Sequence, residues 1–274
     1  MGVIETVRRW PVTARLIAVN GVVFLVLRLA VIAGLFAGVR DVLPSVLSMV
    51  ELPGSPMALA RAPWTVITYM FAQYDILHLF FNMVWLWWFG SIFMFRCSGS
   101  QLFVLYLYGG LAGALLFIAA CVCFPFVGAG AGRLIGSSAA VMAIVTATAV
   151  LMPDFGMRLL LFGEVKLKWI ALVSILLVLI GVTGDNAGGE MAHVGGILVG
   201  LLFGMRLRHG QDITAPVRRL VSGRDRRQRR PVSPSSTSSP QRELDEILDK
   251  IRRSGYSSLT ADERRRLFDV SKKL

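Results

Sequence analysis

The sequence alternates between long apolar runs and short segments rich in glycine, proline or charge. The first run, residues 16–36, has the length of a membrane-spanning helix and exceeds the apolar core of a cleaved signal peptide. Later runs predict five more apolar helices, over residues 76–95, 102–124, 138–151, 169–182 and 191–206. The pattern therefore predicts an all-α, polytopic membrane protein in which residues 16–206 form a bundle of six transmembrane helices.

Two parts of this region depart from a plain apolar span. Arg28 lies near the middle of the first run, so we expect its side chain either to face the bundle or to extend along a tilted helix. Residues 40–75 contain four prolines and are too broken to cross a membrane. We expect them to form a long outer loop, partly at the membrane interface, with Trp64 and Tyr69 as interfacial aromatic residues.

The composition fits a membrane protein, because 55% of the 274 residues are apolar and only 17% are charged. The net charge of +12 arises mainly near the C-terminus, since 18 of the 29 Lys and Arg residues follow residue 205. Arginines beside a membrane segment indicate a topology signal and a contact with anionic lipid rather than with nucleic acid. The three cysteines match no metal-site or disulfide spacing, and we expect neither a metal nor a cofactor.

The distribution of basic residues also sets the expected orientation. Lys and Arg residues occur in residues 1–15, at Arg96, after the fourth helix and in the tail, which all lie on one side of a six-helix arrangement. Basic loops normally face the cytoplasm. Residues 1–15 and the C-terminal tail are therefore both expected to be cytoplasmic.

The C-terminal tail has a pattern of its own. Residues 207–240 are rich in Arg, Ser and Pro and predict a disordered basic linker. Residues 241–274 predict a short helical hairpin, with Thr260-Ala-Asp-Glu263 as the capping box of its second helix. Such a hairpin is too small to be stable alone, so it either docks on a partner or stays only nascent.

Polar residues stand near the outer ends of the second, fourth and sixth predicted helices. They are His78 and Asn82, then Ser138, then His193. The fourth helix has 14 residues, or about 21 Å at ~1.5 Å per residue, which is short of a hydrocarbon core of ~30 Å. We therefore expect Ser138 to lie below the membrane surface, in a polar cavity where these side chains meet.

His193 and Ser138 are candidates for a base and a nucleophile. Gly196 and Gly200 follow the histidine at helical spacing and allow a neighbouring helix to approach closely. A close approach would bring the imidazole within hydrogen-bond distance of the hydroxyl that follows Gly136 and Ser137. The alternative is ordinary membrane packing, with a histidine that bonds to a carbonyl group.

His78 and Asn82 lie four residues apart and share one face of the second helix. Their donors either stabilise an oxyanion at Ser138 or hold two helices together through a hydrogen bond. The pair alone does not distinguish between these alternatives.

Together these residues resemble the motifs of the rhomboid family of intramembrane serine proteases. The resemblance covers about residues 16–206 and rests on three motifs in order on alternate helices: His78-Leu-Phe-Phe-Asn82, Gly136-Ser-Ser138-Ala139, and Ala192-His193-Val-Gly-Gly196 with Gly200. It implies a catalytic dyad of Ser138 and His193 without an acid. It also implies an oxyanion hole formed by His78, Asn82 and the backbone N–H of Ser138.

The resemblance further implies an endopeptidase of the bacterial cytoplasmic membrane that cleaves the transmembrane segments of other membrane proteins. The leading alternative is an inactive relative that binds membrane clients. A transporter is a second alternative, which the absence of a repeat of broken helices disfavours. The sequence predicts no particular client and no oligomeric state.

Four positions differ from the usual pattern of the family. Ala139 replaces glycine, Met142 replaces an aromatic residue that commonly stacks on the histidine, Gln73 replaces a frequent histidine and Glu190 replaces a frequent asparagine. One methyl group at position 139 is expected to be tolerated. Glu190 either influences the protonation of His193, if the two are close, or stabilises the N-terminus of its own helix.

Overall fold

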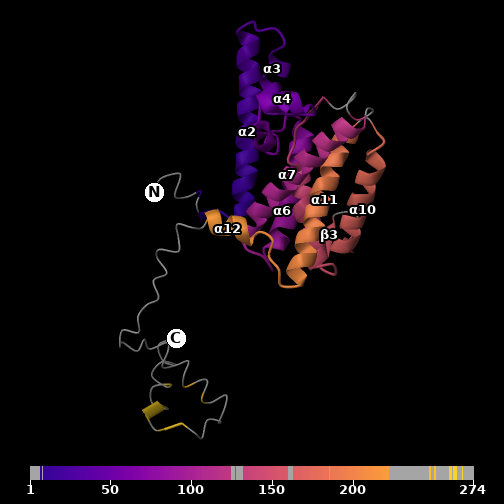
Figure 1. Ribbon diagram of the computed structural model, residues 1–274. Coiled ribbons are helices and arrows are strands. Elements are labelled where there is room, and N and C mark those ends of the chain that lie inside the picture. Colours follow the sequence, from indigo (N-terminus) through magenta and orange to yellow (C-terminus); the bar gives the residue numbers. More distant parts are fainter. Residues whose placement is uncertain are drawn as a thin grey trace. The chain divides into compact units, whose positions relative to one another are not determined.

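The computed structural model describes residues 7, 9–124, 127, 132–159, 163–184 and 186–221, and a few positions near the C-terminus: 247, 250, 259, 260, 262, 263 and 267. The chain divides into two compact units, Met1–Val221 and Ser222–Leu274. The first unit is mostly helical, and each predicted apolar run forms a helix (Figure 1): α2 (Val12–Phe36), α6 (Ile76–Phe93), α7 (Gly99–Cys123), α9 (Ser138–Leu151), α10 (Leu167–Gly181) and α11 (Ala187–Arg208).

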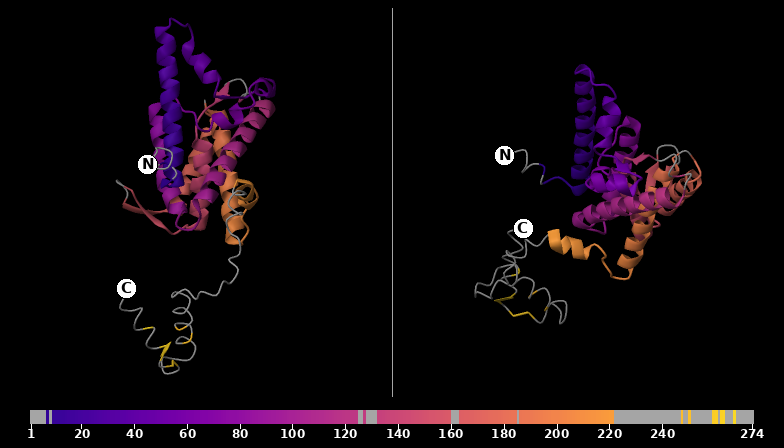
Figure 2. Two further views of the ribbon diagram at one scale, coloured as in Figure 1. Left: turned by 90° about the vertical axis from the view of Figure 1, so that its left-hand side faces the viewer. Right: turned by 45° about the horizontal axis from the view of Figure 1, so that its top comes forward.

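These helices differ in length and in apolar character, the two properties that allow a helix to cross a membrane. Four of them, α2, α6, α7 and α11, are long and apolar enough to do so, whereas α9 and α10 are shorter apolar helices. Helix α9 packs against α6, α7 and α11, and all of its residues but Ser138, Met142 and Val150 are buried. Two further views (Figure 2) show α2 along the edge of the bundle. The short helix α9 is therefore the centre of the bundle.

The helix ends follow local capping chemistry. Asp75 precedes α6, and its carboxylate accepts a hydrogen bond from the backbone N–H of His78 at 2.7 Å. Ser98 and Gln101 form a capping box at the start of α7. At the end of α9 the Arg96 guanidinium donates to the Leu151 carbonyl at 2.9 Å, which satisfies one of the open carbonyl groups of the last turn.

The sequence pattern predicted an all-α chain, and the structure corrects this by adding two short pairs of strands. Strand β1 (Leu52–Pro53) pairs with β2 (Arg133–Leu134), and β3 (Gly156–Leu159) pairs with β4 (Gly163–Lys166), both antiparallel. Strands this short carry no alternating pattern that could be read from sequence. The first pair ties the loop after α2 to the segment just before Ser138.

The predicted outer loop contains three short helices: α3 (Val42–Ser48), α4 (Pro56–Arg61) and α5 (Thr65–Thr68). Trp64 is exposed, as expected of an interfacial residue, and its indole N–H donates to the Met49 carbonyl at 2.9 Å. The prediction for Tyr69 was wrong, because its side chain is buried and its hydroxyl donates to the Gly110 carbonyl of α7 at 2.6 Å. The end of this loop is therefore part of the protein core.

Arg28 faces the protein, which is the first of the two alternatives for this residue. Its guanidinium donates to the Tyr74 carbonyl at 2.6 Å and lies 3.9 Å from the centre of the Tyr74 ring. A second aromatic ring, that of Phe24, lies 5.3 Å away. The charge on α2 is thus compensated by a carbonyl group and by aromatic faces just before α6.

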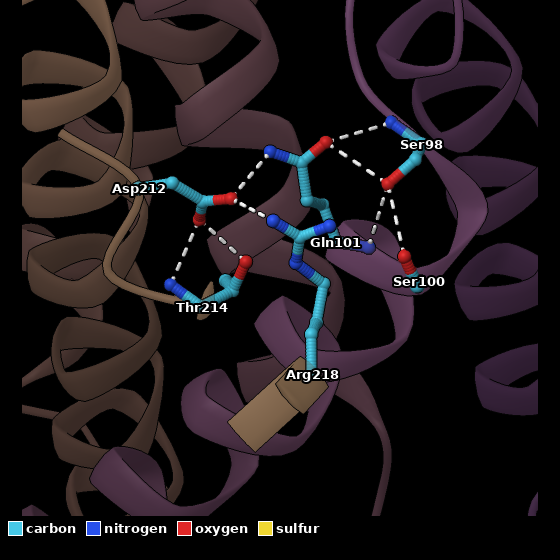
Figure 3. Close-up of polar contacts among 6 residues, drawn as sticks. All are labelled: Ser98, Ser100, Gln101, Asp212, Thr214 and Arg218. Atoms are coloured by element: carbon cyan, nitrogen blue, oxygen red, sulfur yellow. Dashed lines mark hydrogen bonds and ion pairs between the residues drawn. The ribbon is translucent and has the colours of Figure 1, made fainter. Parts of the chain in front are cut away.

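The segment after α11 is ordered where a linker was expected. Helix α12 (Ala215–Val221) follows a turn in which Asp212 accepts hydrogen bonds from the Thr214 backbone N–H at 2.9 Å and the Gln101 amide at 3.0 Å. Arg218 on α12 donates to the same carboxylate (Figure 3). Burial acts to raise the pKa of Asp212, but the bonds from Thr214 and the charge of Arg218 outweigh it, so the pKa lies below its usual value.

Two truncations test whether α12 belongs to the first unit, Met1–Val221, which is called the membrane unit below. Removal of residues 222–274 is expected to leave the melting temperature of the membrane unit unchanged. Removal of residues 210–274 also takes away Asp212 and its contact with Gln101, at a cost of about 1–3 kcal/mol. For a unit of this size we expect a melting temperature lower by roughly 2–4 °C per kcal/mol, measured by thermal unfolding in detergent. Equal melting temperatures for the two truncations would contradict this assignment.

In the second unit three of the described residues, Lys250, Thr260 and Glu263, form a polar cluster. Thr260 and Glu263 exchange the two bonds of a capping box, with the Thr260 N–H 2.8 Å from a Glu263 oxygen and the Glu263 N–H 3.3 Å from the Thr260 hydroxyl. Lys250 lies 2.9 Å from the same carboxylate. The rest of the predicted linker from residue 222 and most of the predicted hairpin lie outside the described residues.

Candidate active site

The site is built on a close approach of α11 to α9. A Cβ atom added to Gly196 would lie 2.0 Å from the Ala139 carbonyl oxygen, and one added to Gly200 would lie 2.4 Å from the Ala143 carbonyl oxygen. Contacts this short leave no room for a side chain, so the two backbones touch directly. His193, one turn before Gly196, is thereby held beside the first turn of α9.

This approach places the imidazole of His193 against the candidate nucleophile. The Nε2 atom of His193 lies 2.7 Å from the Ser138 hydroxyl oxygen, and its Nδ1 atom lies 2.9 Å from a carboxylate oxygen of Glu190. An ionised carboxylate can only accept hydrogen bonds, so the contact with Glu190 suits the tautomer in which Nδ1 carries the proton. In that tautomer Nε2 has a free lone pair that can accept a hydrogen bond from the Ser138 hydroxyl.

The turn before α9 is held against the core and leaves the backbone N–H of Ser138 without a partner in the helix. Gly136 has φ +131°, a conformation that side chains rarely adopt, and a Cβ there would lie 2.9 Å from the His78 ring. Its N–H donates to the Tyr69 carbonyl at 3.0 Å, which fixes the turn to the core. Because Ser138 is the first residue of α9, its own backbone N–H has no acceptor within the helix.

A cavity of about 320 Å³ opens over Ser138 and His193. Its wall comes from α6, α9, α10 and α11 and combines polar with apolar side chains: His78, Phe81, Asn82, Trp85, Ser138, Val141, Met142, Ser174, Leu177, Val178, Glu190 and His193. The four residues expected to meet at one depth therefore share one cavity. Within it Asn82 is buried, whereas His78 is exposed and rests against Gly136.

A buried amide, Gln73, holds Asn82 in place. Its side-chain N–H groups donate to Asn20 on α2 at 3.2 Å and to the Ser137 hydroxyl at 3.1 Å. Its oxygen must then face Asn82, whose amide N–H donates to it at 2.9 Å. This leaves the second N–H of Asn82 available to the cavity. The sequence pattern missed this role, although a polar residue five positions before His78 was a visible signal.

Ala139, which replaces the usual glycine, does not crowd the cavity. Its methyl group points at α7, where a Cβ on Gly113 would lie 2.6 Å from it. Met142 does line the cavity. Across the described part of the chain, no group of three His, Cys, Asp or Glu residues could hold a metal ion.

Comparison with known proteins gives two family matches. The model of the rhomboid domain matches residues 60–210, and a family of unknown function, DUF6576, matches residues 237–273. Proteins named rhomboid protease GlpG from Yersinia pseudotuberculosis serotype I (strain IP32953) and from Yersinia pestis (strain Pestoides F) are 29% identical over 144 residues. Each alignment covers 51% of this chain and 46% of the relative, so the chain spans about half the length of the curated relatives it matches.

Proposed function

The chain belongs to the rhomboid family, and we propose that it is a serine endopeptidase that hydrolyses peptide bonds in or near the transmembrane segments of other membrane proteins. The observation that carries the proposal is the contact of 2.7 Å between the Ser138 hydroxyl and His193 Nε2 inside the cavity. A hydroxyl paired with an imidazole lone pair is the arrangement that activates serine for acyl transfer.

The reaction follows from these two groups. The Ser138 oxygen attacks the carbonyl carbon of the substrate while His193 Nε2 takes the hydroxyl proton. The tetrahedral intermediate collapses, the C–N bond breaks and the imidazolium returns its proton to the leaving amine. Water then attacks the acyl-enzyme, again with His193 as base, and releases the second product and Ser138.

Three donors are proposed to stabilise the negative charge on the intermediate. They are the backbone N–H of Ser138, the free amide N–H of Asn82 and the imidazole of His78. The Ser138 N–H lies at the N-terminus of α9, where the helix dipole favours negative charge. The hydrogen bond from Asn82 to Gln73 supports this role, because it restrains the amide group before the reaction begins.

Substrates are proposed to reach the site from the lipid. The cavity wall is apolar where α6 and α10 contribute Phe81, Trp85, Leu177 and Val178. Helix α10 buries only Leu167, Ala171 and Val178, and its other apolar side chains are mostly exposed. An apolar cavity wall of this kind suits an unfolding transmembrane segment better than a soluble peptide.

The chain is an integral membrane protein, and we propose that the four long apolar helices and the shorter α9 and α10 all cross the bilayer, with both termini in the cytoplasm. The basic residues on the inner side of this arrangement support that orientation. A bacterial cytoplasmic membrane is the proposed location. The arginine-rich segment after Val221 is proposed to contact anionic lipid and not nucleic acid, because it directly follows the membrane unit.

Reconstitution tests the proposed activity. The purified chain in liposomes is expected to cleave a fluorescent transmembrane reporter, and His193→Ala is expected to slow cleavage by about 10²- to 10⁴-fold through loss of the base. His209→Ala is the matched control, because His209 lies at the end of α11 outside the cavity. Wild-type protein that neither cleaves the reporter nor reacts with a fluorophosphonate would favour the inactive client-binding alternative.

A further inference from the structure

Glu190 touches the edge of the His193 ring opposite to the nucleophile. Its carboxylate oxygen lies 2.9 Å from Nδ1, while the Ser138 hydroxyl oxygen lies 2.7 Å from Nε2. The three groups thus form one chain of hydrogen bonds across the imidazole. We propose that Glu190 is a positioning residue that completes a Ser138–His193–Glu190 triad, an inference that rests on the proposed peptidase function.

The position of the carboxylate is fixed by its own helix. Glu190 precedes His193 by three residues, so both side chains lie on the same face of α11 about one turn apart. The Glu190 backbone N–H donates to the Asn186 carbonyl at 3.1 Å, which places the residue firmly within the first turn. The geometry of the pair is therefore set by a regular helix and not by a loop.

A neighbouring helix supplies a second constraint. A Cβ atom on Gly181, at the end of α10, would lie 2.8 Å from Cγ and 2.9 Å from Cδ of Glu190. The absence of a side chain at Gly181 therefore makes room for the acid. Only 20% of the Glu190 side chain and 19% of the His193 side chain are exposed. Stabilisation of the helix N-terminus alone would require neither this packing nor a direct contact with Nδ1.

The carboxylate would act on the reaction in two ways. It accepts from Nδ1–H, which keeps the lone pair on Nε2 directed at the Ser138 hydroxyl and excludes the unproductive tautomer. It also places a negative charge beside the imidazolium that forms when Ser138 loses its proton. Both effects pass through His193, since Glu190 contacts neither the reacting oxygen nor the proposed oxyanion donors by any hydrogen bond in the structure.

Substitution of Glu190 in the full chain tests the proposal. Glu190→Gln is expected to lower kcat for reporter cleavage by about 10²- to 10⁴-fold with KM changed by less than about two-fold, because the amide can donate to the ring and stabilise the wrong tautomer. Glu190→Asp keeps an acceptor and is expected to recover a large part of the loss. Glu164→Gln, on the exposed hairpin β3–β4, is the matched control and is expected to retain full activity.

A double substitution separates positioning from structure. In a His193→Ala background, Glu190→Gln is expected to cause no further loss in the rate of fluorophosphonate labelling, since its effect requires the imidazole. Unchanged kcat in Glu190→Gln would overturn the proposal. It would also be overturned if Glu190→Gln slowed labelling equally in the wild-type and His193→Ala backgrounds and lowered the melting temperature in both, because the effect would then be structural. Wild-type protein without cleavage and without labelling would instead overturn the peptidase function itself, and the triad with it.

Discussion

Ser138→Ala is expected to reduce reporter cleavage by at least about 10³-fold and to abolish covalent labelling by a fluorophosphonate. The substitution removes the oxygen that forms the acyl-enzyme. In the described part of the chain, no other hydroxyl group forms a hydrogen bond with His193 Nε2. Because Ser138 is the first residue of α9 and is only half-buried, its replacement is expected to leave the fold intact. Cleavage kinetics and intact-protein mass spectrometry measure the two effects.

The preceding residue provides a matched control for this experiment. Ser137 is fully buried, and its hydroxyl accepts from Gln73 at 3.1 Å and not from the histidine. Ser137→Ala is therefore expected to keep labelling and cleavage per folded molecule while it lowers stability by about 1–3 kcal/mol, because a buried donor loses its acceptor. Loss of labelling in Ser137→Ala together with normal labelling in Ser138→Ala would exchange the roles of the two serines.

Gly196→Val is expected to have the largest effect on folding. A Cβ atom at this position would lie 2.0 Å from the Ala139 carbonyl oxygen, which belongs to the backbone and cannot rotate away. Helices α9 and α11 must separate to admit the side chain, at a cost of about 3 kcal/mol or more. The same separation lengthens the contact between Ser138 and His193. We expect a low yield of folded protein, a reduced melting temperature and no measurable cleavage.

Gly21→Val on α2 serves as the control for Gly196→Val. The added Cβ at Gly21 would meet nothing within 4 Å, so the same change of residue type tests helix propensity without a clash. We expect this variant to fold and to cleave as wild type. Gly196→Ala should lie between the two. A Gly196→Val protein with wild-type stability would show that α9 and α11 do not pack as described.

The helices and the meeting of the polar residues could be predicted from the sequence because both depend on periodic signals. Apolar runs ended by glycine, proline or charge locate α9 to the residue, Ser138–Leu151. The spacing of Gly196 and Gly200 after His193 indicates which face of α11 can touch another backbone. Helix order then places Ser138 and His193 at the same end of the bundle.

Other features could not be predicted because they depend on contacts between residues far apart in the sequence. Leu52 pairs with Leu134, a pairing of two-residue strands that leaves no pattern in either segment. Tyr69 resembles an interfacial residue until the loop folds back on α7. The direction of a single side chain is equally hidden, and for this reason the sequence left open whether Glu190 reaches His193 or only its own helix end.

The close approach of Gly181 to Glu190 connects the wall of the cavity with the position of the Glu190 carboxylate. Helix α10 forms one wall of the cavity through Leu177 and Val178, and its last residue is the surface on which Glu190 rests. A displacement of α10 that admits a substrate would also release the carboxylate from that surface. The wall of the cavity and the position of the carboxylate behind the imidazole would therefore change together.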